Sequence, residues 1–180
     1  MTVVEQDLDK LDDLPLRDAR LIQFLEYWRS LRGDLALPRY RDVDPIAIPK
    51  LLSHVWCWSY DREQDTFRGR LAGEAVMQVY GTRDMRGLAL NELVEQPLAG
   101  QLHARYRRVV TTPMALHFQG SAVLDEGETI RAERLALPLC DRTTDSRVII
   151  GLSLYDRRPG LCTGQGFVLE EGRLSWAPID

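Results

Sequence analysis

The chain has 180 residues, of which 44% are hydrophobic and 28% are charged, and its formal net charge is −4. A chain of this length buries about two-thirds of its unfolded surface, so one domain can fold without a disulfide or a structural metal. The acidic balance disfavours nucleic-acid binding, and no apolar run approaches the roughly 18 residues of a membrane span.

The first 16 residues are acidic and lack an apolar core, which predicts a mobile segment rather than a signal peptide. The three cysteines, Cys57, Cys140 and Cys162, have no close spacing. Unpaired cysteines of this kind are typical of a reduced compartment, and we therefore expect a cytoplasmic protein.

A flanking helix is predicted within residues 17–36, and Gly33 is expected to end it. Its apolar side chains recur at helical spacing and form one stripe: Leu21, Phe24, Leu25 and Trp28. Such a stripe must be buried, either against a face of the following sheet or against its copy in a second subunit. We expect the second arrangement, a homodimer through these four side chains.

The middle of the chain predicts strands and helices in a definite order. Alternation and aromatic content predict strands at 54–60 and 67–72. Short helices follow at 73–79 and 87–94 after an earlier one near 46–52, and a longer helix is expected at 97–111, with Pro97 in its first turn. Three strands complete this order, at 114–124, 129–139 and 147–155, and residues 167–176 are expected to form a hairpin or to pack loosely.

Several short motifs accompany this order of elements: Trp28, Leu31-Arg32-Gly33, Leu37-Pro38, Asp44-Pro45, Phe67-Arg68-Gly69-Arg70-Leu71-Ala72-Gly73, Gly81, Gly87 and Pro138-Leu139. Through them, residues 18–157 resemble the PAS fold, and more closely a PAS-like family of alphaproteobacterial proteins of unknown function. The resemblance implies an α+β fold with a five-stranded antiparallel sheet, helices on one face, a ligand cavity between them and an N-terminal helix. The expected division is a mobile segment (1–16), the flanking helix (17–36), the PAS-like domain (37–158) and a C-terminal tail (159–180).

A pocket in this fold should be mostly apolar with few polar groups. By position in the fold, ten side chains are candidates for its walls and floor, although the same side chains could instead fill the core completely and leave no cavity: Trp56, Trp58, Phe67, Leu71, Met77, Tyr80, Tyr106, Phe118, Leu135 and Leu152. The ligand would be a small apolar molecule, or an anion held by Arg68 or Arg70. Both arginines, however, lie on the strand face opposite Phe67 and Leu71.

Catalytic and cofactor motifs are mostly missing from the sequence, which has no C-x-x-C, H-E-x-x-H or phosphate-binding glycine loop. His103 lies on the helix that supplies the iron ligand in haem-binding PAS proteins, but its surroundings do not match theirs. A half-buried histidine is the favoured interpretation, and no metal is expected. The cofactor is left open: the fold requires none, and neither haem nor flavin is favoured.

The sequence thus favours a non-catalytic sensory or interaction module that signals to a separate partner. A bound ligand would shift the packing of the flanking helix. Two alternatives stay open. One is a small cone-shaped α+β enzyme of the isomerase or lyase type, using His103 or His117 with Glu133 or Asp125. The other is a purely structural dimerisation domain.

Overall fold

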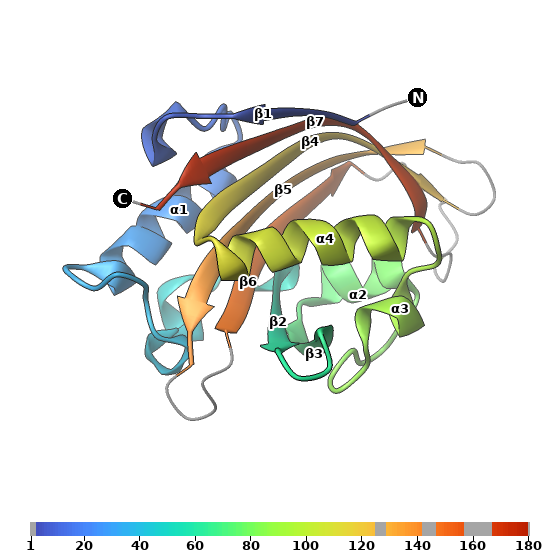
Figure 1. The fold of residues 1–180 in the computed structure, drawn as a ribbon, viewed down its shortest axis with the longest axis horizontal. Helices are drawn as coiled ribbons and strands as arrows, with labels where there is room; N and C mark the ends of the chain where they lie inside the picture. The colour runs from blue at the N-terminus through green and yellow to red at the C-terminus, as the bar shows by residue number, and fades with distance from the viewer. Residues whose placement is uncertain (1–2, 125–128, 142–146, 157–166, 180) are drawn as a thin grey trace.

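The computed structural model describes residues 3–124, 129–141, 147–156 and 167–179 (Figure 1). A mixed seven-stranded sheet crosses the molecule in the order β1-β7-β4-β5-β6-β2-β3. The strands are β1 (Val3–Asp7), β2 (Val55–Asp61), β3 (Thr66–Ala72), β4 (Met114–Leu124), β5 (Thr129–Cys140), β6 (Arg147–Asp156) and β7 (Phe167–Pro178).

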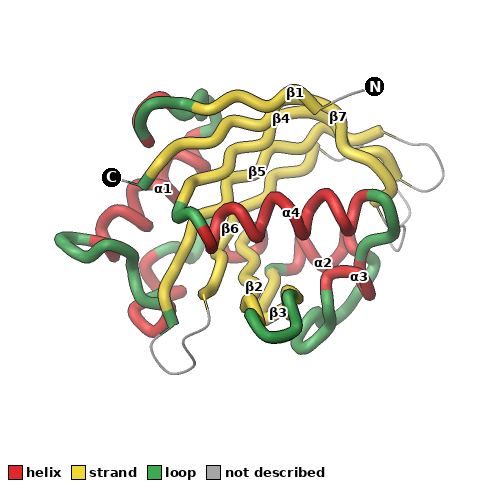
Figure 2. The backbone as a smooth tube through the Cα atoms, in the orientation of Figure 1, coloured by secondary structure: helices red, strands yellow, loops and turns green. Residues whose placement is uncertain are grey.

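Helices lie on both faces of this sheet (Figure 2). The helices are α1 (Ala19–Arg32), α2 (Glu74–Tyr80), α3 (Leu90–Leu93) and α4 (Leu98–Thr111). Within the described residues, four single 3-10 turns join them to the strands: η1 (Leu11–Asp13), η2 (Tyr40–Asp42), η3 (Pro45–Ala47) and η4 (Leu52–His54). We call the face covered by α2, α3 and α4 the inner face, and the face covered by α1 the outer face; each has its own hydrophobic cluster.

The predicted five-stranded antiparallel sheet is confirmed as the contiguous part β4-β5-β6-β2-β3. Two further strands extend it, which corrects the expectation of a mobile N-terminus and a hairpin or loosely packed tail. Strand β7 pairs antiparallel with β4 over eleven positions, and β1 pairs parallel with β7. The acidic composition of residues 1–16 hid β1, because its backbone pairing owes nothing to side-chain hydrophobicity.

The helix α1 is ended by Gly33, as predicted, with φ at 50° in the region that a residue with a Cβ rarely adopts. Its four apolar stripe residues, Leu21, Phe24, Leu25 and Trp28, are all buried in the outer cluster. The indole Nε1–H of Trp28 also donates to the Pro138 carbonyl oxygen at 3.0 Å. The expected dimer interface is therefore wrong for these side chains, because the sheet of the same chain already covers them.

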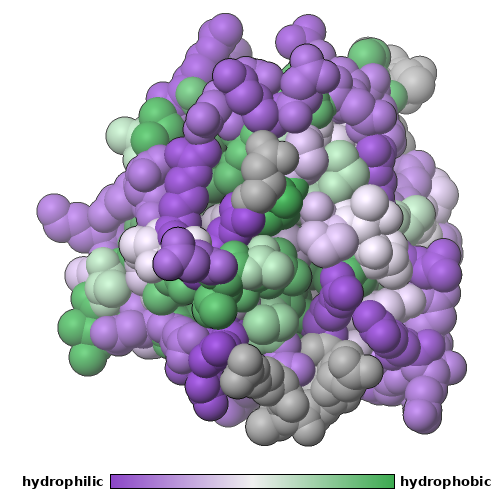
Figure 3. Space-filling view, turned by 60° about the vertical axis from the view of Figure 1, so that its left-hand side comes forward, coloured by the Kyte–Doolittle hydropathy of each residue, from purple (hydrophilic) through white to green (hydrophobic). Residues whose placement is uncertain are grey.

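The position of α1 also corrects the expectation of helices on one face only. Both faces of β5 and β6 are apolar, and a sheet that is apolar on both faces needs cover on both. Some large hydrophobic side chains stay exposed on this side of the molecule, among them Ile22, Leu35 and Ile46. The view from this side shows hydrophobic atoms between hydrophilic ones (Figure 3). The short helix expected near 46–52 is replaced by the turns η3 and η4.

Replacing Trp28 by alanine should destabilise the protein by about 3–5 kcal/mol, because the change removes a buried ring and leaves the Pro138 carbonyl without its donor. The matched control is Ile22→Ala on the same helix, where the side chain is 45% exposed and the expected change is within about 0.5 kcal/mol. Urea unfolding followed by circular dichroism measures both. Equal effects of the two changes would contradict the packing of α1 against the outer face.

Candidate ligand-binding site

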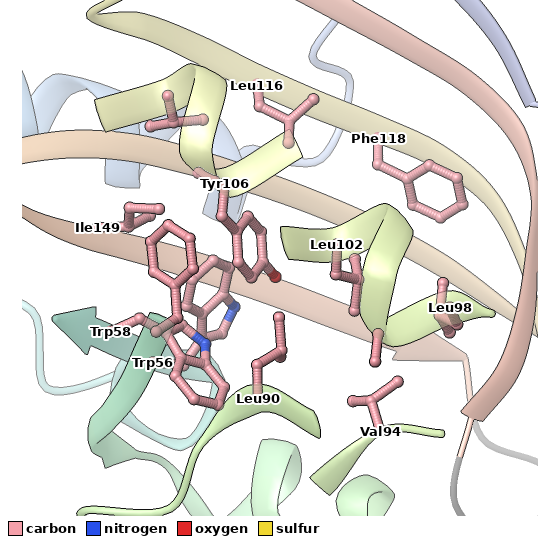
Figure 4. Packing of buried hydrophobic residues seen from close by; sticks show 14 of the residues in the cluster. Trp56, Trp58, Leu90, Val94, Leu98, Leu102, Tyr106, Leu116, Phe118 and Ile149 are labelled. Atoms are coloured by element: carbon pink, nitrogen blue, oxygen red, sulfur yellow. The ribbon is translucent and has the colours of Figure 1, made fainter. Parts of the chain in front are cut away.

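Aromatic side chains from four elements meet on the inner face of the sheet (Figure 4). Trp56 from β2 lies 5.4 Å from Tyr106 of α4, and Tyr106 lies 5.8 Å from Phe67 of β3, measured between ring centroids. Trp58 and Phe118 are buried in the same cluster. Gly151 allows the Trp56 ring to lie directly on the β6 backbone, because a Cβ at this position would collide with the ring. These rings form the centre of the layer between α4 and the sheet.

The expected floor of the pocket is wrong at Leu135 and Leu152. Both side chains are buried, but in the outer cluster beneath α1. Strand side chains alternate between faces, so their neighbours Arg134 and Ser153 point to the inner face instead. The sequence could not show which of these residues point to the inner face, because Leu135, Ala136 and Leu137 are all apolar and show no alternation of polar and apolar residues.

Leu71 is also placed outside the inner layer, and its side chain is 38% exposed. Phe67 and Leu71 would share a face in a regular strand. However, the register between β2 and β3 shifts after Cys57, so that Trp58 pairs with Gly69 while Cys57 pairs with Leu71. This bulge reverses the face of the residues that follow it. From α2, Tyr80 packs against the inner cluster, and Met77 is half-buried.

A buried ionic network crosses the inner layer. Glu170 of β7 accepts from Arg105 of α4 at 2.8 Å and from Arg134 of β5 at 2.9 Å. The side chains of Arg105, Arg134 and Glu170 are only 8%, 3% and 1% exposed. Two guanidinium groups therefore share one carboxylate in surroundings from which water is excluded, and one positive charge exceeds the negative charge among these three side chains.

This network continues toward the aromatic rings. Arg134 Nε donates to Ser153 Oγ at 3.2 Å, and Trp56 Nε1 donates to the same oxygen at 2.8 Å. Burial is the largest single effect on Arg134 and disfavours its charged form, but the Glu170 carboxylate and three nearby tyrosines together outweigh it and raise the pKa of Arg134 well above its ordinary value. Arg134 therefore stays charged throughout the physiological range.

Two tyrosines are held in their neutral form in the same layer. Burial raises the pKa of Tyr106 to about 12, and burial also raises the pKa of Tyr80 well above its ordinary value. Their neutral hydroxyl groups can donate a hydrogen bond to an acceptor. The inner layer thus combines apolar rings with a few hydroxyl and guanidinium donors.

Sequence reasoning missed the three charged residues of this network. Arg105 lies on the buried side of α4, whereas its neighbours Arg107 and Arg108 lie on the exposed side. Arg134 carried a usable signal, because it alternates with Ala132 and Ala136, and both alanines belong to the inner cluster. A charged residue in an apolar strand face indicates either a buried partner or a ligand.

The arginines proposed to hold an anion, Arg68 and Arg70, do not reach the inner layer. Arg70 pairs with Asp141 at 2.9 Å and stacks over the Tyr40 ring at 4.0 Å. Arg68 is exposed and contacts Gln64 and the Gly87 carbonyl.

His103 lies at the outside of α4, where it faces the β2–β3 turn. Its Nε2–H donates to the Asp65 carbonyl oxygen at 2.7 Å, and its ring meets the edge of Phe67 with centroids 5.5 Å apart. The nitrogen that would bind a haem iron is thus used in this turn, and the residue does not suit that role.

One of the residue pairs considered for an enzyme site, His117 and Glu133, lies within hydrogen-bonding distance in the structure. His117 Nε2–H donates to Glu133 at 2.8 Å on the outer face, whereas Asp125 lies outside the described residues. Burial lowers the pKa of His117, although the bond to Glu133 opposes this shift. Within the described part of the chain, no group of three or more His, Cys, Asp or Glu side chains is arranged to hold a metal ion.

A PAS domain family profile matches residues 16–154 of this chain. The chain belongs to the PAS domain family. PAS domains are sensory and signalling modules, and the match covers α1 as well as the five-stranded part of the sheet. Strand β7, which carries Glu170, lies beyond the matched residues, as does β1.

Two solved structures are similar to this PAS domain in outline. The PAS domain of BvgS from Bordetella pertussis has a TM-score of 0.44 at 16% identity, covering 76% of this chain and 89% of that one. The VqmA dimer from Vibrio cholerae, a LuxR-type receptor, has a TM-score of 0.42 at 16% identity, covering 66% and 59%. None of the curated proteins compared matches the chain. No helix in the described ranges is long and apolar enough to cross a membrane.

Replacing Glu170 by glutamine should destabilise this PAS domain by about 3–5 kcal/mol, because two buried guanidinium groups would lose their only shared carboxylate. Glu171→Gln is the matched control on the next residue of β7. Its side chain points to the other face, so the expected change is within about 0.5 kcal/mol. Guanidinium unfolding compares the two variants. A Glu170→Gln protein as stable as the control would show that the network carries no stabilising interaction.

Proposed function

We propose that this PAS domain is a sensory module that binds a small anionic molecule in its inner layer and reports the binding to a separate partner. The observation that supports the proposal is the excess positive charge of Arg105 and Arg134 over Glu170. No catalytic step and no cofactor is part of the proposal.

The charge argument rests on the cost of burying ions. A guanidinium group removed from water is stable only when an anion or several acceptors compensate it. Glu170 compensates one of the two guanidinium groups. A ligand carboxylate or phosphate would compensate the second, and the planar donor fork of arginine suits both groups.

The residues around the Arg105–Glu170–Arg134 network favour a ligand that is anionic at one end and apolar elsewhere. Trp56 and Phe118 offer flat apolar surfaces, and Arg134 itself lies over the Phe118 ring with its Cζ 5.9 Å from the centroid. The hydroxyl of Tyr106 lies between Trp56 and Leu102 (Figure 4). An aromatic or short aliphatic acid therefore matches the layer better than a fully polar ion.

The response to the ligand would pass through β7. Arg105, Arg134 and Glu170 come from α4, β5 and β7, so an anion that compensates one arginine leaves Glu170 to the other and changes how β7 is held to the rest of the layer. The ligand would then favour a second packing of β7 and of β1 beside it, by a shift of population. This route replaces the flanking helix as the first element to move, because α1 lies on the outer face.

We also propose that the module acts as a homodimer in the cytoplasm. Its interface must use side chains other than Leu21, Phe24, Leu25 and Trp28. The exposed hydrophobic residues beside α1, Ile22, Leu35 and Ile46, offer one such surface.

The test is a thermal-shift and calorimetry screen with aromatic carboxylates, aliphatic carboxylates and phosphate monoesters. At least one acid should bind the wild-type protein and raise its melting temperature. Arg105→Lys keeps the charge but removes the fork, and should weaken that binding by roughly tenfold or more. Arg107→Lys, two residues along α4 and exposed, is the matched control and should bind as the wild type does. Binding of neutral compounds alone, or equal binding by the two variants, would contradict the proposal.

A further inference from the structure

A second pocket lies on the opposite face of the sheet, and the proposed function makes no use of it. It has a volume of ≈ 440 Å³, within the range of small-molecule sites. We call it the outer pocket. Its walls come from the start of α1 and from the neighbouring strands β4, β5 and β6, and the residues that matter here are Asp18, Arg20, Arg131, Glu133, Leu154 and Asp156.

The faces of the strands fix where this pocket lies. Leu154 belongs to the outer cluster, and Glu133 bonds to His117, which alternates on β4 with the outer-cluster residue Ala115. Arg131 and Asp156 are cross-strand partners, each two residues beyond the pair Glu133 and Leu154. The pocket therefore occupies the part of the outer face that α1 leaves uncovered.

The two charged residues at the start of α1 are already engaged with each other. Arg20 donates from Nε at 3.0 Å and from Nη2 at 2.8 Å to the two oxygens of Asp18. Asp18 also accepts from the Arg20 backbone N–H as the cap of the helix. This pair contributes one wall without adding net charge.

The carboxylate of Glu133 is the hydrogen-bond acceptor that the pocket offers to a ligand. Its side chain is 17% exposed, and one of its oxygens is fixed by the buried His117 at 2.8 Å. Burial favours the neutral imidazole, so this hydrogen bond holds the carboxylate in place without neutralising it. Across the pocket, Arg131 and Asp156 carry opposite charges, so among the described residues that line it three carboxylates face two guanidinium groups.

We propose that the outer pocket binds a small organic cation, a primary amine or a guanidine, on the carboxylates of Glu133 and Asp156. One excess negative charge matches one cationic group, and the oxygen of Glu133 that His117 does not hold can accept from it. The side chain of Leu154 and the aliphatic part of Arg131 provide contact for the carbon chain of such a ligand.

The test titrates putrescine and agmatine into the protein by calorimetry, and records ¹H–¹⁵N spectra to locate the site. Both amines should bind saturably and shift the amides of residues 119–120, 131–133 and 154–156. Glu133→Gln should weaken putrescine binding by roughly 10-fold to 100-fold. Glu95→Gln, an exposed glutamate in the loop between α3 and α4, is the matched control and should change nothing.

Asp156→Asn keeps the test decisive if Glu133→Gln does not fold, because Asp156 is exposed and its change should lower the affinity but not the melting temperature. The inner-layer variant Arg105→Lys should bind putrescine as the wild type does, which separates this proposal from the proposed function. The inference is overturned if neither amine binds, if the shifted amides lie elsewhere, if both carboxamide variants keep full affinity, or if succinate binds here in place of the amines.

Discussion

The bond between Glu170 and its two arginines is the constraint on which the inner half of this molecule depends. It joins α4, β5 and β7, which are far apart in the sequence, at one point where water is excluded. Three charges in such a place are costly, and replacing them with apolar residues is often neutral or stabilising in other proteins. These charges therefore act by fixing the register of β7 rather than by adding net stability. The network requires Glu170 to face inward, and a slip of β7 by one residue would turn it to the other face.

Much of the fold could be predicted from local patterns. The periodicity at Leu21 to Trp28 predicted α1 and the stop at Gly33 predicted its C-terminal end, and the alternation of Trp56, Trp58 and Tyr60 predicted β2. These signals are local, so one sequence contains them completely. The parallel pairing of β1 with β7 could not be predicted in this way, because its partners lie about 170 residues apart and β1 is mostly polar.

The candidate site was predictable only in part, and the reason is strand parity. Aromatic residues mark their own positions, so Trp56, Phe67, Tyr106 and Phe118 were placed together correctly in one layer. Leucines in a sheet that is buried on both faces do not indicate which face they point to. The bulge opposite Cys57 turns the Leu71 side chain to the other face, and nothing in the composition of the strand signals it. Arg134 was the exception, because a charged residue that alternates with apolar alanines indicates a buried partner or a ligand rather than apolar packing.

The two faces of the sheet are linked through shared strands. Glu133 and Arg134 are consecutive on β5 and point to opposite faces, and so are Ser153 and Leu154 on β6. A strand is stiff along its length, so a change in the position of Arg134 moves the backbone that also positions Glu133. If an anion bound at the proposed inner site also moved β5, thermodynamic linkage would make the coupling reciprocal: the anion would change the affinity of the outer pocket by the same factor by which a cation there changes the affinity of the inner layer. The pair of His117 and Glu133 is the element through which such coupling would act, because it joins β4 to β5 and its His117 side chain is only 1% exposed.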